Sequence, residues 1–594
     1  MKQFFKMFFA SLLAMIIAGV IVVGLIMGAI IGLVAKASSN EGKETKINSA
    51  SILVIDVAKK YHEQGMSNSF ASFSNESSYS SGLYDLTQAI KYAKTDDKIK
   101  GILLKLGGSA NGWATLQQLH MALVDFKTSG KTIYAYGESI SQGAYYVASA
   151  ADSIYLNPVG SIEIKGFATV MPFFKTTLEK LEVQPEIYYA GKFKSATEPF
   201  RADKISDPNR LQIQAYQHDL WSEFASAAAK HAHTDTATVN KWTATGAIQF
   251  PADAVKYKLI DGLLYWDEVE QHLRAKTGQK GKEDVKYVTA DDYRNTVKSG
   301  SKISENKIAI LFAEGDIADG EQEDEYQIGS KTLVESIRKL KDNDKIKAVV
   351  LRVNSPGGSG LASDVILREL QLLKAKKPLI VSMGDYAASG GYFIACHADS
   401  IFALPNTITG SIGVFSVLFN FQGLLKNKMG VTFDEVKTAP YADFPTVSRP
   451  LSPEEATRMQ ASIDTFYSMF KSRVSLGRKI SVGDVDSIAQ GRVWTGSAAL
   501  NIHLVDALGN LDRAILSASR MAKLTDYKVV TYPEPSDKLD ALLRRFKGNS
   551  ASAMMSTAIK EQLGSDYEWY KQVSGLRKMN GKAMMAMPFL INVQ

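Results

Sequence analysis

The chain of 594 residues is too long for one hydrophobic core, and its length favours roughly two to four domains. Its composition, 45% apolar and 22% charged, is that of a globular protein, and the formal charge of +7 is too mild and too evenly spread to indicate nucleic-acid binding. The single cysteine, Cys396, excludes an intramolecular disulfide and a thiolate metal cluster.

The first predicted element is a membrane span within residues 1–36. No charged residue occurs from Met7 to Val34, and about 20 apolar residues in a helix already cross the hydrocarbon core. A cleaved signal peptide is the alternative, because Ala35-Lys36-Ala37 has cleavage-like spacing. Signal peptides have shorter apolar regions than this one, so we expect a retained transmembrane helix.

The basic residues around this span predict its orientation. Lys2 and Lys6 precede it, and by the positive-inside rule they leave the N-terminus in the cytoplasm. We therefore expect a single-pass protein in which everything after Lys36 lies on the extracytoplasmic side.

Most of the remaining chain is an internal repeat at an offset of 247 residues. Residues 98–106 align with residues 345–353, and both runs have the apolar character of buried parallel strands. Further matches at this offset are Gly137-Glu138 with Gly384-Asp385, Tyr145 with Tyr392, and residues 151–154 with residues 398–401. A repeat this long indicates two copies of one domain rather than a solenoid.

The repeat divides the chain into five parts. We expect a first domain at 50–280, a polar linker at 281–306, a second domain at 307–525 and a C-terminal helical extension at 526–594, after the anchor at 1–36. Short apolar strands alternate with amphipathic helical segments in both copies, which predicts α/β domains with largely parallel sheets.

The second copy contains a candidate nucleophile at a strand-to-helix turn. An apolar strand ends near Gly384, small residues surround Ser389, and an apolar helix-like run follows. The Gly390 amide would lie at a helix N-terminus, where backbone N–H groups lack intrahelical partners. Acyl transfer needs two such donors for its oxyanion. Residues 354–359, Asn-Ser-Pro-Gly-Gly-Ser, follow the preceding strand and could supply the second, since glycines permit a close backbone approach.

A serine hydroxyl needs a base, and the histidines do not supply an obvious one. Of the eight, His397 is read as a packing residue behind the turn, and none has triad-like surroundings. A buried lysine can serve instead, because desolvation lowers the pKa of its amine. Lys192 and Lys194 in the first copy are both candidates, and spacing alone does not choose between them.

Three segments together resemble a known family. Lys194-Ser-Ala-Thr-Glu-Pro-Phe200, residues 354–359 and Asp385-Tyr-Ala-Ala-Ser-Gly-Gly-Tyr392 are similar to segments of the long, duplicated form of the signal peptide peptidase SppA (protease IV, S49 serine peptidase) family. The resemblance extends over the anchor and both copies. It implies an α/β fold class of two tandem ClpP/crotonase-like domains preceded by one transmembrane helix, and a Ser-Lys dyad.

Matching the family motif residue by residue assigns the roles at the site. Ser389 would be the nucleophile and Lys194 the general base, and Ser411, in Thr409-Gly-Ser-Ile-Gly413, would hold the lysine amine. Gly357 or Gly358 would form the oxyanion hole with the amide of Gly390.

The first copy lacks the candidate serine, and the second copy lacks the candidate lysine. Gln142 aligns with Ser389 in the first copy, while the second has no lysine between Lys437 and Lys471, and Ala442 or Asp443 stands at the aligned position. The dyad can therefore form only where a first copy meets a second, within one chain or between neighbouring chains.

The resemblance implies a membrane-anchored serine endopeptidase that degrades signal-peptide remnants and similar apolar peptides through an acyl-enzyme, without metal or cofactor. It further implies a homo-oligomer, expected to be a tetramer, in the inner (cytoplasmic) membrane of a bacterium with its catalytic domains on the periplasmic side. A crotonase-like acyl-CoA enzyme and a non-catalytic membrane scaffold stay open as alternatives. Covalent labelling of Ser389 by a phosphonate would favour the peptidase.

Overall fold

The computed structural model describes residues 47–67, 79–277, 285–299, 304–324, 326–534 and 581–587, together with Lys6, Met7, Met15, Ile17, Ala18 and Ile21. Nearly all of the membrane span predicted within residues 1–36 thus lies outside the described residues. In the described part of the chain, no helix has the length and apolar character needed to cross a bilayer.

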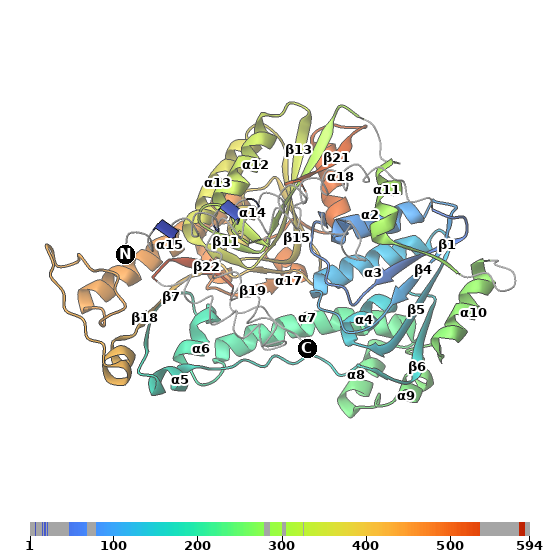
Figure 1. Ribbon diagram of the computed structural model, residues 1–594, viewed down its shortest axis with the longest axis horizontal. Helices are drawn as coiled ribbons and strands as arrows, with labels where there is room; N and C mark the ends of the chain where they lie inside the picture. Colours follow the sequence, from blue (N-terminus) through green and yellow to red (C-terminus); the bar gives the residue numbers. More distant parts are fainter. Residues whose placement is uncertain are drawn as a thin grey trace.

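The first domain is built on a six-stranded parallel sheet in the order β8-β6-β5-β4-β1-β9 (Figure 1). Its strands are β1 (Ser51–Asp56), β4 (Ile99–Lys105), β5 (Thr132–Ile140), β6 (Ser153–Ile162), β8 (Gly262–Leu263) and β9 (Lys286–Thr289). A short hairpin pairs β2 (Met66–Ser67) with β3 (Tyr79–Ser80).

The second domain repeats this sheet in the order β20-β16-β15-β13-β10-β21, again parallel. Its strands are β10 (Lys307–Glu314), β13 (Ile346–Ser355), β15 (Leu379–Ala388), β16 (Ser400–Ala403), β20 (Ala507–Leu508) and β21 (Lys528–Tyr532). β17 (Ile408–Gly410) joins the end of β15, and β19 (Val493–Thr495) pairs antiparallel with β17. The repeat predicted from the sequence is therefore a repeat of strand order.

Helices cover both faces of each sheet, which explains why the central strands are apolar on both sides. In the second domain α12 (Ser330–Asp342), α13 (Gly360–Lys374), α14 (Gly390–Ala395) and α15 (Pro453–Arg478) share the larger core with one face of the sheet, and α18 (Leu511–Met521) covers the other face. The first-domain helices are α2 (Leu83–Ala93), α3 (Trp113–Lys127), α4 (Gln142–Ala148), α5 (Lys175–Lys180), α6 (Glu198–Arg201), α7 (Asp207–His231), α8 (Thr236–Thr245), α9 (Pro251–Lys256), α10 (Trp266–Thr277) and α11 (Ala290–Ser299), with η2 (Ser195–Thr197). Those of the second are α12 (Ser330–Asp342), α13 (Gly360–Lys374), α14 (Gly390–Ala395), η3 (Leu424–Lys428), α15 (Pro453–Arg478), α16 (Val482–Ile488), α17 (Gly496–Asn501) and α18 (Leu511–Met521).

A third sheet joins distant parts of the chain in the order β12-β11-β14-β22-β18-β7. Its strands are β7 (Gln184–Ala190), β11 (Asp316–Ala318), β12 (Gln327–Gly329), β14 (Gly357–Ser359), β18 (Val414–Asn420) and β22 (Met584–Ala586). β7 comes from the first half of the chain, and its seven residues pair antiparallel with all seven of β18. Figure 1 shows β7, β11, β18 and β22 of this sheet together near α15.

The range 281–306, predicted to be a linker, differs from that expectation where it is described. β9 completes the first sheet, and α11 packs on it through the fully buried Tyr293, whose hydroxyl donates to Asp96. The polar side chains of this range lie on the outer faces of a short strand and a short helix. A sequence with so many polar residues looks like a linker, although it forms regular structure here.

The C-terminal extension at 526–594 is predicted from the sequence to be helical, but its described parts contain the strands β21 and β22. β21 extends the second sheet beside β10, as β9 extends the first beside β1. β22 lies in the third sheet. Residues 535–580 and 588–594 lie outside the described residues. Short strands whose partners are hundreds of residues away leave little periodicity for a sequence to display.

The two domains meet through buried polar contacts. The carboxylate of Asp385 accepts hydrogen bonds from the Thr115 amide (2.8 Å) and hydroxyl (2.7 Å) at the start of α3. Nearby, Arg352 from the second domain reaches Glu63 and Gln118 from the first. These hydrogen bonds connect β13 and β15 of the second domain to the first domain, and β15 is the strand that leads to Ser389.

Candidate active site

Ser389 lies in a strained turn between β15 and α14. Its φ of 54° and ψ of −115° lie outside the ordinary regions for a side-chain-bearing residue, and strain of this kind persists only where the surroundings enforce it. Its amide donates to the Gly410 carbonyl (2.8 Å), and its carbonyl accepts from Phe393 in α14. The hydroxyl is thereby fixed at the carboxyl end of the central sheet.

The two glycines after Ser389 let the helix start pack closely against the glycine turn that follows β13. A Cβ on Gly390 would lie 2.7 Å from Ser363 Oγ, and a Cβ on Gly391 would lie 2.6 Å from the Ser355 carbonyl oxygen. Any side chain at these positions would push α14 away from that turn.

Lys194 is brought to Ser389 by the pairing of β7 with β18. The chain turns at Gly191 (φ 105°), where a Cβ would lie 2.4 Å from the Gln490 carbonyl carbon, and the lysine then points into the second domain. Lys194 Nζ lies 2.9 Å from Ser389 Oγ, within the same chain. The other candidate, Lys192, is exposed, with its amine over the Phe193 ring.

The amine of Lys194 is held in a site that favours its neutral form. The side chain is 1% exposed, and burial lowers its pKa well below that of a free lysine. It donates to the carbonyl oxygen and to Oγ of Ser411, both at 3.1 Å. A neutral amine has two N–H bonds and one lone pair, so these two acceptors leave the lone pair for the hydroxyl of Ser389.

Ser411 is itself constrained. It has a φ of 49° between β17 and β18, and its amide donates to the Arg492 carbonyl (2.7 Å). The backbone rather than a flexible side chain therefore sets one of the two acceptors for the lysine amine.

A buried network holds the Lys194 turn, and sequence analysis did not find it. Gln212 in α7 donates to the Phe193 carbonyl (3.2 Å) and to Ser195 Oγ (3.1 Å), and accepts from the Val493 amide (3.2 Å). It bonds both residues next to Lys194 and the strand beside β17. No local motif distinguishes this glutamine from others on amphipathic helices.

The glycine turn after β13 brings a second amide next to the Gly390 amide. Gly357 has a φ of 102°, and its own N–H donates to Ser355 Oγ (3.2 Å). A Cβ on Gly357 would lie only 2.7 Å from the Gly390 nitrogen. Because the Gly357 amide already donates within its own turn, to Ser355, Gly358 and Gly390 are the candidates for the pair of oxyanion donors.

The first domain has no nucleophile at the equivalent turn. Gln142 begins α4 there, is buried, and its Oε1 accepts from the Lys165 and Gly166 amides, both at 3.0 Å. The glutamine thus ties down the turn that a serine occupies in the second domain. His397 hydrogen-bonds Gln371, and its contacts place it in the packing behind the turn.

A strained serine beside a buried lysine amine, next to two closely packed glycine turns, resembles the arrangement of serine hydrolases in which lysine replaces histidine. Comparisons with known proteins make the class specific. Residues 125–280 and 371–525 match peptidase family S49, and residues 300–409 match Clp protease.

Relatives match over most of their length. "Protease 4" of Salmonella typhi is 37% identical over 495 residues, 81% of this chain and 78% of that protein. "Protease 4" of Haemophilus influenzae is 36% identical over 453 residues, 74% and 72% of the two chains. The chloroplastic serine protease SPPA of Arabidopsis thaliana is 31% identical over 479 residues, 79% and 70%. The chain belongs to peptidase family S49, and it is a serine endopeptidase with two tandem S49/ClpP-like α/β domains.

Proposed function

We propose that the protein is a membrane-anchored endopeptidase with a Ser-Lys dyad, in which Ser389 is the nucleophile and Lys194 the general base. The observation that carries the proposal is the 2.9 Å separation of Lys194 Nζ and Ser389 Oγ in a fully buried setting. Among the described residues no carboxylate forms an ion pair with Lys194, so nothing offsets the effect of burial on its pKa.

In this mechanism neutral Lys194 takes the proton of Ser389 as Oγ attacks the peptide carbonyl. The Gly358 and Gly390 amides donate to the developing oxyanion, a type of interaction that contributes about 10²–10³-fold in kcat per donor. The lysine ammonium then protonates the leaving amine. Water activated by Lys194 hydrolyses the acyl-enzyme and regenerates Ser389.

We propose apolar peptides, including signal-peptide remnants, as substrates. Two apolar clusters flank the catalytic turn: one around Phe200 and Phe415, the other around Tyr216 and Ile408. A relative from Enterococcus faecium, 34% identical over 241 residues, carries the name "Putative signal peptide peptidase SppA". That name supports the same substrate class here.

We further propose that residues 1–36 anchor the protein in the bacterial inner membrane, with the domains at 50–280 and 307–525 on the periplasmic side. The support is the uncharged run from Met7 to Val34 and the lysines that precede it. Protease accessibility of a C-terminal tag in spheroplasts, compared with intact cells, tests the orientation.

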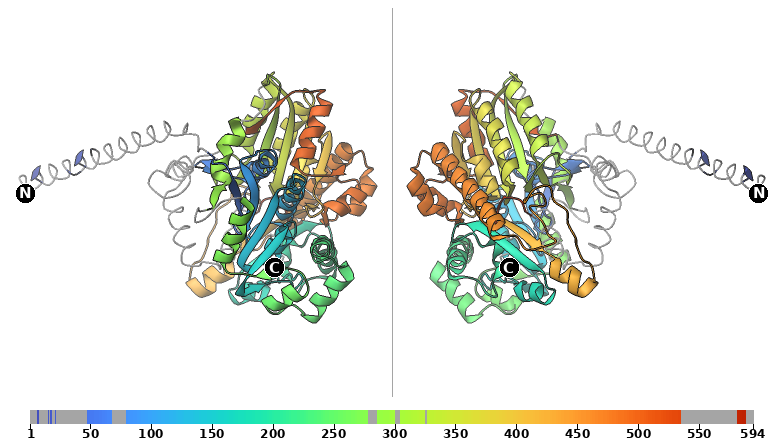
Figure 2. Two further views of the ribbon diagram at one scale, coloured as in Figure 1. Left: turned by 90° about the vertical axis from the view of Figure 1, so that its right-hand side faces the viewer. Right: turned by 90° about the vertical axis from the view of Figure 1, so that its left-hand side faces the viewer.

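We propose a homo-oligomer, with four subunits expected. Residues 422–452 form an arm that projects from the second domain, as seen in Figure 1 and in the turned views of Figure 2. It exposes several large apolar side chains: Met429, Val431, Phe433, Val436 and Tyr441. Apolar exposure of this kind is typical of surfaces that pair with another protein.

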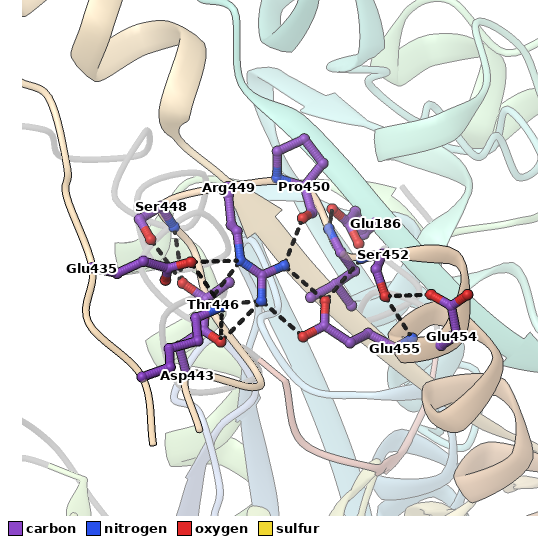
Figure 3. Close-up of polar contacts among 12 residues, drawn as sticks. Glu186, Glu435, Asp443, Thr446, Ser448, Arg449, Pro450, Ser452, Glu454 and Glu455 are labelled. Carbon is purple, nitrogen blue, oxygen red and sulfur yellow. Dashed lines mark hydrogen bonds and ion pairs between the residues drawn. The ribbon is translucent and has the colours of Figure 1, made fainter. Parts of the chain in front are cut away.

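The base of this arm is fixed by charge (Figure 3). Arg449 donates to Asp443 (2.9 and 3.0 Å) and to Glu455 at the start of α15 (2.7 and 2.8 Å). The Leu451 amide donates to Glu186 in β7 (3.0 Å). An arm braced at its base can present its apolar tip to a neighbouring copy. Replacing Phe433 and Val436 by Ser should lower the mass measured by light scattering; an unchanged mass would contradict the role of the arm.

Peptidase assays of Ser389→Ala and Lys194→Met test the dyad, with Lys192→Met as the matched control. We expect loss of at least 10³-fold in kcat for the first two, and near-parental activity for the control. A fluorophosphonate should label the parent on Ser389. Folded Ser389→Ala or Lys194→Met protein with near-parental rates would refute the dyad, and absence of labelling would argue against Ser389 as the nucleophile.

A further inference from the structure

The C-terminal segment 581–587 passes directly beside the catalytic turn. Its strand β22 lies between β14, which contains the proposed oxyanion donor Gly358, and β18, which follows Ser411. Its ladder with β14 is antiparallel and pairs Gly357 with Ala586, Gly358 with Met585 and Ser359 with Met584. An extended peptide added to a sheet edge in this way is a common mode of peptide recognition.

The register of β22 with β14 directs the carbonyl of Met585 toward the proposed oxyanion donors. The Met587 amide donates to the Pro356 carbonyl (2.8 Å), and the Gly360 amide donates to the Ala583 carbonyl (3.2 Å). Hydrogen-bonded pairs in an antiparallel ladder recur every second residue. The pair between these two is Gly358 with Met585, so the Met585 carbonyl faces the Gly358 amide.

The close packing around Gly357 and Gly390 places the Met585 carbonyl oxygen at the same position, independently of the strand register. A Cβ on Gly357 would lie 2.0 Å from the Met585 carbonyl oxygen, and a Cβ on Gly390 would lie 3.1 Å from it. This oxygen therefore sits between the glycine turn and the start of α14, where the carbonyl oxygen of a bound substrate would have to lie.

The side chains of the segment fill apolar sites on both sides of the catalytic turn. Met585 is fully buried in the main core, and its Cε lies 3.5 Å from the position of a Cβ on Gly360. Met584 joins the cluster around Phe415, and Met587 joins the cluster around Tyr216. Three methionines thus occupy three apolar sites around Ser389.

We propose that residues 583–587 are a self-ligand of the peptide-binding groove and compete with peptide substrates for it. Met585 occupies the pocket for the residue whose carbonyl is attacked, so this pocket accepts unbranched apolar side chains, and Gly360 keeps it open. The inference rests on the proposed peptidase function, because that function makes the groove a substrate site. Binding of the segment in the groove does not itself depend on catalysis.

The test measures binding of a fluorescent peptide with the sequence of residues 581–587 to full-length Ser389→Ala protein, which cannot turn it over. In that background we compare the parent segment with Met585→Asp, which puts a charge into the apolar pocket. Met521→Asp, at an exposed methionine of α18, is the matched control. Because a tethered ligand acts at high effective concentration, release of the segment should tighten peptide binding about tenfold or more.

Equal binding to all three proteins, or no binding to any, would overturn the proposal. Met585→Gly empties the pocket without a charge and serves as the second variant if Met585→Asp melts early. A peptide with Asp in place of Met585 should not bind. Activity assays of Ser389 and Lys194 variants judge the dyad separately, so a failure of the catalytic assignment leaves this binding result interpretable.

Discussion

Arg352 of the second domain and Glu63 of the first form an ion pair that is almost wholly buried, with Nε 2.8 Å from Glu63 Oε2. The guanidinium also donates to Gln118, Ser382 and the Met383 carbonyl. Every N–H of this side chain that faces the interface has a partner. Through Ser382 and Met383 the ion pair contacts β15, the strand that leads to Ser389, so it links the docking of the domains to the position of that serine.

Glu63→Gln should therefore destabilise the protein by about 3–5 kcal/mol, because it leaves a buried guanidinium without its counter-charge. Denaturant unfolding measures this loss. Lys91→Gln is the matched control, since Lys91 and Asp512 form an exposed ion pair across the same interface. Its cost should be roughly 0–1 kcal/mol. Equal costs for the two variants would show that the buried pair does not secure the interface.

The rate of peptide hydrolysis should rise with pH through the lowered pKa of Lys194. Burial lowers this pKa from the usual 10.5, and only the neutral amine can accept the serine proton. The ascending limb of kcat/KM should have its midpoint well below that of a free lysine. A profile that rises only near pH 10.5 would contradict a buried, neutral base.

Lys194→Met should be inactive yet more stable than the parent at low pH. The unfolded chain keeps the lysine proton up to about pH 10.5, whereas the folded chain releases it at lower pH. Between the two values the unfolded state binds more protons, so the free energy of unfolding of the parent rises with pH. Thermal melts across this window should show that rise in the parent and in Lys192→Met, but a smaller one in Lys194→Met.

Ser411→Ala should lower kcat roughly 3- to 10-fold with little change in KM, because one of two acceptors that orient the amine is lost while the Ser411 carbonyl remains. Ser416→Ala is a matched control. Ser416 is another fully buried serine, in β18, and its hydroxyl has no hydrogen-bond partner in the described structure. A kcat equally reduced in both variants would point to a general packing effect.

Gly358→Ala should abolish most activity, about 10²-fold or more, because its Cβ would lie 2.0 Å from the Ile317 carbonyl oxygen and displace an oxyanion donor. Gly108→Ala is the control. Gly108 lies in the corresponding turn of the first domain, and a Cβ there meets nothing within 4 Å. The control should keep parental activity and stability. Active, folded Gly358→Ala protein would exclude this amide from the oxyanion hole.

The turn at Ser389 could be predicted from the sequence because its determinants are local. A β-branched strand, a cluster of small residues and an apolar helix lie within about twenty residues of one another. The repeat was visible for the same reason: buried parallel strands remain apolar in both copies. Both features depend on short stretches of chain.

Other parts depend on contacts across the fold and could not be predicted. Lys192 and Lys194 differ in burial only because β7 pairs with β18 and turns at Gly191. Gln212 acts through residues far from it in sequence. β9, β21 and β22 are short strands whose partners lie elsewhere in the chain, so composition alone suggested a linker and a helical tail for these regions.

The pairing of β7 with β18 has a consequence for synthesis. Lys194, the proposed base, is translated first, but the contacts that bury it form only after β17, β18 and β19 have been made and folded around it. A nascent chain that has just the first domain carries an amine without a serine, and a fragment with just the second carries a serine without an amine. The proposed Ser-Lys dyad therefore cannot form in a chain that has been translated only through the first domain, and catalysis by this dyad requires both domains to be folded together.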